Sequence, residues 1–160
     1  MNVSALRQLY SLVSSIPANE FCLNLFYMKN GDYVQGCGLG YAARFNLCGL
    51  QIENAWQLPE VKDRVTGVTY RGMPAASYAF GVTNQEALAL FSGAGRSKYD
   101  NAADMNWSAV STHKQLWMHR MEQFFAEKGL QLENAEAIFE DQPKLIAYVF
   151  DDTNLTFGDA

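Results

Sequence analysis

The sequence predicts a mainly helical domain of the α+β class, with about four to six helices and a short β element near residues 144–150. Two observations predict the helices: several segments place apolar residues at helical spacing, and a threonine-glutamate capping box opens one of them. A chain of 160 residues with 49% hydrophobic residues has the size of one domain and can bury a substantial core. No repeat or linker divides it, so we expect a single globular domain over residues 1–160.

The first half of the chain predicts two helices and little regular β structure. A helix over residues 3–15 presents one apolar face and stops before Pro17. Residues 20–28, EFCLNLFYM, suit either a buried helix or a strand, and the Lys-Asn-Gly-Asp that follows is a turn signal. A second helix is expected within residues 36–49. Residues 51–78 contain several glycines and prolines, and their VTGVTYRG favours a short strand.

The second half has stronger helix signals. The capping box TNQE opens a helix over residues 83–93, because its threonine hydroxyl and glutamate carboxylate can each accept a backbone N–H. A polar loop then leads to the strongest helix, at about residues 108–128, which carries one apolar face. A short helix around residues 133–140 and a strand over KLIAYVF, residues 144–150, complete the prediction.

Negative charge is concentrated at the C-terminal end. The net charge is −5, yet residues 1–130 sum to +1 and residues 131–160 to −6. We expect this acidic C-terminal part of the domain to meet a basic surface on a protein partner. Its candidate contacts are Glu140, Asp141, Asp151 and Asp152. A secondary binding patch is expected at Arg96 and Lys98, in the glycine-containing loop. Direct nucleic-acid binding is not expected, because no basic stripe with interleaved aromatic residues is present.

No secretory signal opens the chain, and no run reaches the roughly 18 apolar residues that a membrane span needs. We therefore expect a cytoplasmic protein without a membrane partner. The three cysteines, Cys22, Cys37 and Cys48, are odd in number and not closely paired, which predicts buried, reduced thiols. A zinc site built from them and a histidine stays an alternative, but their spacings match no familiar zinc motif. No metal or cofactor is expected.

The stretch GCGLGYAARFNLCGL, residues 36–50, has three interpretations. Its glycines match the dinucleotide fingerprint formally, but the buried strand before it and the acidic strand end after it are missing. Cys37 at a helix N-terminus could be a nucleophile with His113 as its base, as in papain-like hydrolases. The third interpretation is tight packing, with small residues that allow another element to approach closely.

Three segments together resemble a family of short bacteriophage and prophage proteins. They are the CxxGxAA step at residues 37–43, AFGVTNQEALALF at residues 79–91, and FFAEKG at residues 124–129. The resemblance implies no catalytic residue, because the family has no assigned activity. Residues 51–72 and the acidic end at 131–160 depart from its pattern, so these two regions are candidates for what is particular to this protein.

The sequence and the resemblance favour a non-catalytic accessory protein that binds a host or defence protein in the host cytoplasm, as an inhibitor or modulator. Two alternatives stay open. One is a structural or assembly component of the virion. The other is a hydrolase or transferase that uses Cys37 and His113.

Overall fold

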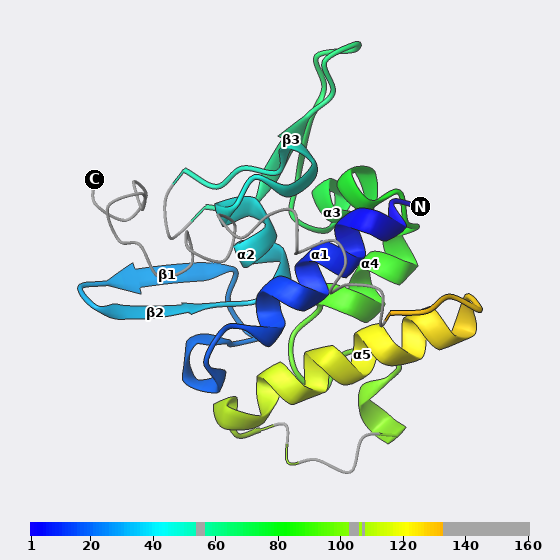
Figure 1. Cartoon of the computed structure of the whole chain (residues 1–160). Coiled ribbons are helices and arrows are strands. Elements are labelled where there is room, and N and C mark those ends of the chain that lie inside the picture. Colours follow the sequence, from blue (N-terminus) through cyan, green and yellow to red (C-terminus); the bar gives the residue numbers. More distant parts are fainter. Residues whose placement is uncertain (54–56, 103–105, 107, 133–160) are drawn as a thin grey trace.

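The computed structural model describes residues 1–53, 57–102, 106 and 108–132. Over these residues the chain has five α-helices and two small antiparallel sheets, which confirms the α+β class (Figure 1). The helices are α1 (Val3–Ser14), α2 (Gly38–Arg44), α3 (Met73–Phe80), α4 (Asn84–Phe91) and α5 (His113–Glu127). The strands are β1 (Tyr27–Asn30), β2 (Tyr33–Gly36), β3 (Glu60–Lys62) and β4 (Thr69–Arg71). The helix expected at 133–140 and the strand expected at 144–150 lie outside the described residues.

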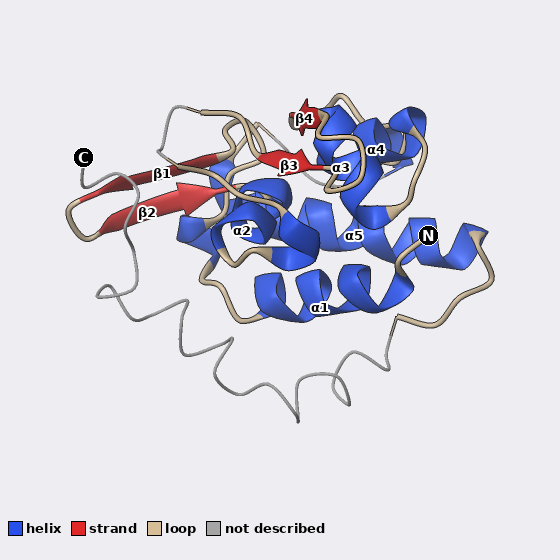
Figure 2. Cartoon of the chain, turned by 90° about the horizontal axis from the view of Figure 1, so that it is seen from above, coloured by secondary structure: helices blue, strands red, loops and turns tan. Residues whose placement is uncertain are grey.

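The core lies where α1 and α5 pack against each other and against α2 and α4 (Figures 1 and 2). The first helix starts where the Asn2 side chain accepts a hydrogen bond from the Ala5 amide, and its inner face is fully buried. Trp117 in α5 is also fully buried, and a Cβ atom at Gly38 of α2 would lie only 2.9 Å from its ring. The packing interpretation of the glycine-rich stretch is therefore confirmed at Gly38.

The two sheets are separate hairpins. In the first, β1 pairs with β2 in a register that places Tyr27 opposite Gly36. The predicted turn lies between these strands, where Gly31 takes a positive φ of 61°. Residues 21–26 are not helical, so the helix alternative for the segment 20–28 is wrong. The strand alternative is correct only for the last two residues of the segment, where β1 begins.

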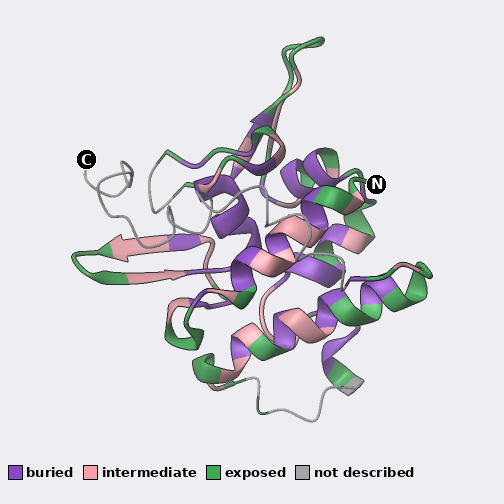
Figure 3. Ribbon diagram, in the orientation of Figure 1, coloured by how far each residue is buried: buried purple, intermediate pink, exposed green. Residues whose placement is uncertain are grey.

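The second hairpin, β3 with β4, projects away from the helices (Figure 1). Figure 3 shows that its far end is exposed, whereas its base meets the buried part of the molecule. The strand expected within VTGVTYRG is confirmed as β4, but its partner β3 was not expected.

Two helix boundaries differ from the sequence prediction. The second helix ends at Arg44 and does not continue to residue 49, because Asn46 and Cys48 take left-handed backbone angles (φ of 58° and 54°) that no α-helix contains. The long helix begins at His113 instead of residue 108, after a single 3₁₀ turn at Val110–Thr112.

Candidate functional site

Cys37 is the N-cap residue of α2, as the sequence predicted, but its thiol is buried. The side chain is 1% exposed, and its sulfur accepts a hydrogen bond from the Gly40 amide at 3.5 Å. Burial raises the pKa of the Cys37 thiol to about 11, and the Gly40 amide pulls the other way by a smaller amount. The local environment therefore stabilises the neutral thiol over the thiolate that a nucleophile needs.

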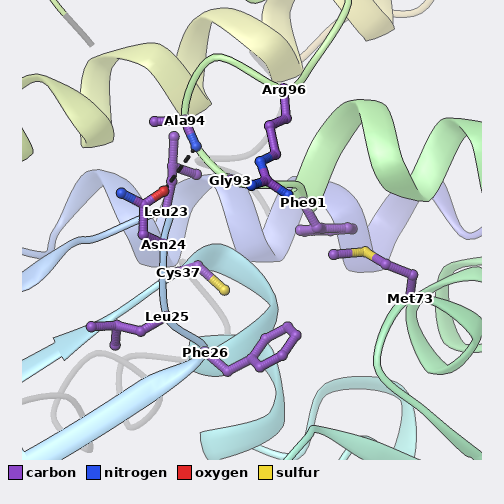
Figure 4. Close-up of a pocket in the computed structure, with 10 residues that line it drawn as sticks. All are labelled: Leu23, Asn24, Leu25, Phe26, Cys37, Met73, Phe91, Gly93, Ala94 and Arg96. Carbon is purple, nitrogen blue, oxygen red and sulfur yellow. Dashed lines mark hydrogen bonds between the residues drawn. The ribbon is translucent and has the colours of Figure 1, made fainter. Parts of the chain in front are cut away.

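Cys37 lines a cavity of about 500 Å³ between the segment before β1 and the loop after α4 (Figure 4). The sulfur points toward the same space as the side chains of Phe26, Met73 and Phe91. Arg96 stands at the edge of this space and is a charged residue in an otherwise uncharged lining. The structure thus brings together two of the residues that the sequence singled out, Cys37 and Arg96.

His113, the expected base for Cys37, has a structural contact. It is fully buried at the start of α5, and its Nδ1 accepts a hydrogen bond from the Leu23 amide at 3.1 Å. Leu23 lines the cavity that contains Cys37, whereas His113 is not among the lining residues. The imidazole therefore holds one wall of the cavity in place, and its Nδ1 is already occupied by a backbone amide.

We expect Cys37 to react slowly with a thiol probe at neutral pH. With a pKa of about 11, against 9.0 for an ordinary cysteine, its thiolate fraction at pH 7.4 is lower by about a hundredfold. The rate should rise about tenfold for each pH unit between 7 and 9. Mass spectrometry of iodoacetamide-treated native protein measures it, with a Cys37→Ser variant to assign the site. Rapid, selective labelling of Cys37 at pH 7.4 would contradict this prediction and favour the enzyme alternative.

Arg96 and Lys98, the expected secondary patch, are both exposed on the loop that follows α4. Lys98 contacts Glu127 of α5 through an exposed ion pair at 3.5 Å and lies over the Tyr99 ring. Its charge is therefore partly neutralised. The Arg96 backbone amide donates to the Gly93 carbonyl oxygen, whereas its guanidinium has neither a hydrogen bond nor an ion pair with any described residue.

A buried ion pair fixes this loop, and sequence reasoning missed it. Arg120 of α5 and Asp100 are both completely buried; Nε donates to Oδ1 at 2.8 Å and Nη2 to Oδ2 at 2.6 Å. Arg120 also donates to the carbonyl oxygens of Ser92 and Gly93, and Asp100 accepts from the Gly95 amide. One signal was available: Arg120 follows Trp117 by three residues, which places it beside the apolar face of the helix.

The remaining predicted contacts, Glu140, Asp141, Asp151 and Asp152, lie outside the described residues. Within the part of the chain that the structure describes, no group of three or more His, Cys, Asp and Glu side chains could hold a metal ion. No helix in those same ranges is both long and apolar enough to cross a membrane. Neither the protein-family models nor the curated proteins and solved structures compared with this chain contain a match to it.

Proposed function

We propose that this chain acts by binding another protein, as a non-catalytic accessory protein of the bacteriophage type that inhibits or modulates a host or defence protein in the host cytoplasm. The observation that carries the proposal is the β3–β4 hairpin, which projects from the helices (Figures 1 and 3) and carries the exposed apolar residues Val65 and Val68. The hairpin lies in residues 51–72, one of the two regions that depart from the pattern of the phage proteins.

Exposed apolar residues gather on this arm and at its base. Half of the large apolar side chains that are exposed in the described residues belong to this region: Leu58, Val65, Val68 and Tyr78. Val65, at the tip, is 95% exposed. Scattered single apolar residues are normal on a protein surface, but a cluster of them is typical of an interaction site.

The tip holds a fixed shape. Asp63 Oδ1 accepts hydrogen bonds from the amides of Val65 and Thr66, at 2.8 and 3.2 Å, and these bonds lower the pKa of its carboxyl group. The Asp63 amide donates to the Val68 carbonyl oxygen and closes the turn. A preformed tip loses little conformational entropy when it binds, which favours affinity.

The base of the arm is anchored as well. The Tyr70 ring of β4 stacks on Tyr78 of α3 with centroids 4.9 Å apart, and Val61 of β3 is buried. Lys62 and Arg64 near the tip are accompanied by Asp63, so the arm has no strongly basic surface. These features support an apolar pocket on a protein partner, rather than a nucleic acid, as its target. In this proposal the acidic C-terminal part and Arg96 steer the encounter.

Replacing Val65 by aspartate should weaken partner capture at least about tenfold, because a buried carboxylate at the centre of an apolar contact would be unpaired. The measurement is affinity capture from host cells with the tagged full-length protein, followed by a binding titration with the protein recovered. Val110→Asp is the matched control, since it makes the same change at an exposed site outside the hairpin.

If the Val65→Asp variant bound the captured protein with the affinity of the parent, the hairpin would not be the contact surface. If the parent captured no protein beyond those that the variant also captures, the proposal would be wrong. Circular dichroism on both variants shows that the fold is intact, and both should match the parent because the two valines are exposed.

A further inference from the structure

The backbone brings Cys22 and Cys37 side by side, although the whole first hairpin separates them in the sequence. The residues just before them, Phe21 and Gly36, form a parallel β-bridge, and the Cys22 amide donates to the Gly36 carbonyl oxygen at 2.9 Å. The two cysteines therefore follow paired residues on two segments that run in the same direction. Paired strands lie about 4.8 Å apart, and the two Cα atoms of a disulfide lie about 4.4–6.8 Å apart. The backbone spacing thus suits a disulfide.

The two thiols also lie near each other. Side chains alternate between the two faces of an extended segment, so the residues that follow a bridged pair share one face. The backbone is extended at Phe21 and at Cys37, which preserves this alternation beside the bridge. Burial raises the pKa of the Cys37 thiol most, and the Cys22 thiol raises it further by a direct electrostatic interaction. Two buried thiols therefore share one small region of the fold.

Little holds the Cys37 sulfur away from Cys22. Its hydrogen bond is accepted from the Gly40 amide at 3.5 Å, and a thiol sulfur is a weak acceptor. The third cysteine has a different place: the Asn2 side chain donates to the Cys48 sulfur at 3.3 Å, in the turn that follows α2. All three thiols are reduced in the structure. The fold therefore selects one pair among the three cysteines.

We propose that Cys22 and Cys37 are a reversible disulfide site, which a small disulfide such as oxidised glutathione converts by thiol exchange. Cys22 reacts first, because it is 5% exposed and Cys37 only 1%. The Cys22 thiolate attacks one sulfur of oxidised glutathione and releases the first glutathione thiolate. The Cys37 thiolate then attacks the Cys22 sulfur and releases the second. Two cysteine thiols are oxidised, one glutathione disulfide is reduced, and the two protons end on the two released glutathione molecules.

The disulfide would close a loop over residues 22–37, which contains the β1–β2 hairpin. A cross-link restricts the unfolded chain more than a native fold that already holds its two ends together. The equilibrium constant for disulfide formation should therefore be larger in the native protein than in the unfolded chain. This site is separate from the β3–β4 hairpin, and the proposal does not depend on the protein-binding function.

The test is an equilibration of the full-length protein with mixtures of reduced and oxidised glutathione, in buffer and in concentrated urea. Free thiols are then blocked in acid, and mass spectrometry of the intact protein and of its peptides identifies each disulfide. We expect the native protein to lose the mass of two hydrogen atoms and to link Cys22 to Cys37. Its equilibrium constant should exceed that of the unfolded chain at least about tenfold. Since equilibrium is measured, the slow reaction of a buried thiol does not affect the result.

Cys48→Ala is the matched control and should change this equilibrium constant less than about twofold, because Cys48 contacts Asn2 instead of the pair. In that background, Cys37→Ala should form no internal disulfide and should carry glutathione on Cys22. Three results would each overturn the proposal: no link between Cys22 and Cys37 in the native protein, an equilibrium constant no larger than in urea, or a native disulfide to Cys48. Absence of glutathione on Cys22 in the Cys37→Ala variant would overturn the order of the two steps. No partner protein is present in this test, so its failure leaves the hairpin proposal as it stands.

Discussion

Replacing Gly40 by alanine should lower the free energy of unfolding by about 3 kcal/mol or more. A Cβ atom at this position would lie 1.5 Å from the Phe26 carbonyl oxygen and 2.4 Å from its carbonyl carbon. These are backbone atoms, so no rotation of a side chain relieves the overlap. The Phe26 carbonyl also accepts from the Cys37 amide, and moving it would break that bond.

Helix propensity predicts the opposite sign for the same change. Alanine in a helix interior is more favourable than glycine by about 1 kcal/mol, and Gly40 lies within α2. The steric term should exceed this gain, because the overlap forces α2 away from the chain before β1.

Urea unfolding followed by circular dichroism measures the effect, with Gly93→Ala as the control. A Cβ atom at Gly93 meets first the side-chain oxygen of Asn24, at 3.1 Å, and a shift of that side chain by a few tenths of an ångström relieves the contact while it still accepts from the Ala94 amide. This control should change stability by less than about 1 kcal/mol. A Gly40→Ala protein as stable as the parent would show that α2 and the segment before β1 do not touch as described.

The sequence predicted best those elements whose signals are local. The capping box that opens α4 forms both of its bonds: Glu86 N–H donates to the Thr83 hydroxyl at 3.1 Å, and Thr83 N–H donates to the Glu86 carboxylate at 2.9 Å. All atoms of this signal lie within four residues. The first helix was predicted for a similar reason, because its apolar spacing repeats over its whole length.

The helix α3 was missed because its signals conflict. Gly72 and Pro74 suggested an irregular segment, yet proline is tolerated in the first turn of a helix, where its missing N–H would have no partner. Its buried residues, Ala75 and Phe80 among them, show that packing stabilises this short helix. That packing involves α1 and the turn at Leu47–Gly49 as well as the adjacent β4 and α4, so it cannot be derived from the segment alone.

The candidate site was predictable only in part, for the same reason. Cys37 was correctly placed at a helix N-terminus, but its burial, and hence its raised pKa, depends on segments that fold over it. The cavity forms between the chain near residue 24 and the loop near residue 94, which are 70 positions apart. Likewise, the position of Arg120 on the helix suggested that it is buried, but nothing near it identified Asp100 as its partner.

The second large effect is expected at this buried pair: Arg120→Met should lower the free energy of unfolding by about 3–5 kcal/mol. Methionine fills much of the space of the arginine stem, so the loss of stability comes mainly from the charge of Asp100, which stays buried. Asp100 would be left buried without its cation, and the carbonyl oxygens of Ser92 and Gly93 would lose their donor. The free-energy cost of burying an unpaired charge is far larger than the stabilisation that an ion pair in water provides.

The exposed pair between Arg71 and Glu60 provides the matched control, because its nitrogen and oxygen are also within hydrogen-bond distance, at 3.1 Å. The two side chains are 62% and 32% exposed, whereas those of Arg120 and Asp100 are completely buried. Arg71→Met should therefore cost less than about 1 kcal/mol in the same urea titration. Equal losses in the two variants would mean that burial does not set the strength of the Arg120 contact.

A double variant separates the pair from its surroundings. Arg120→Met combined with Asp100→Asn removes both charges, so its loss of stability should be smaller than the sum of the two single losses. Limited trypsin digestion reports on the loop itself, because trypsin cleaves after Arg96 and Lys98. The parent should resist cleavage there, since Arg120 and Asp100 hold the loop at both ends, while Arg120→Met should be cut at these positions before the rest of the chain unfolds. If the variant is cut no faster there than the parent, the ion pair stabilises the core without fixing the loop that carries Arg96.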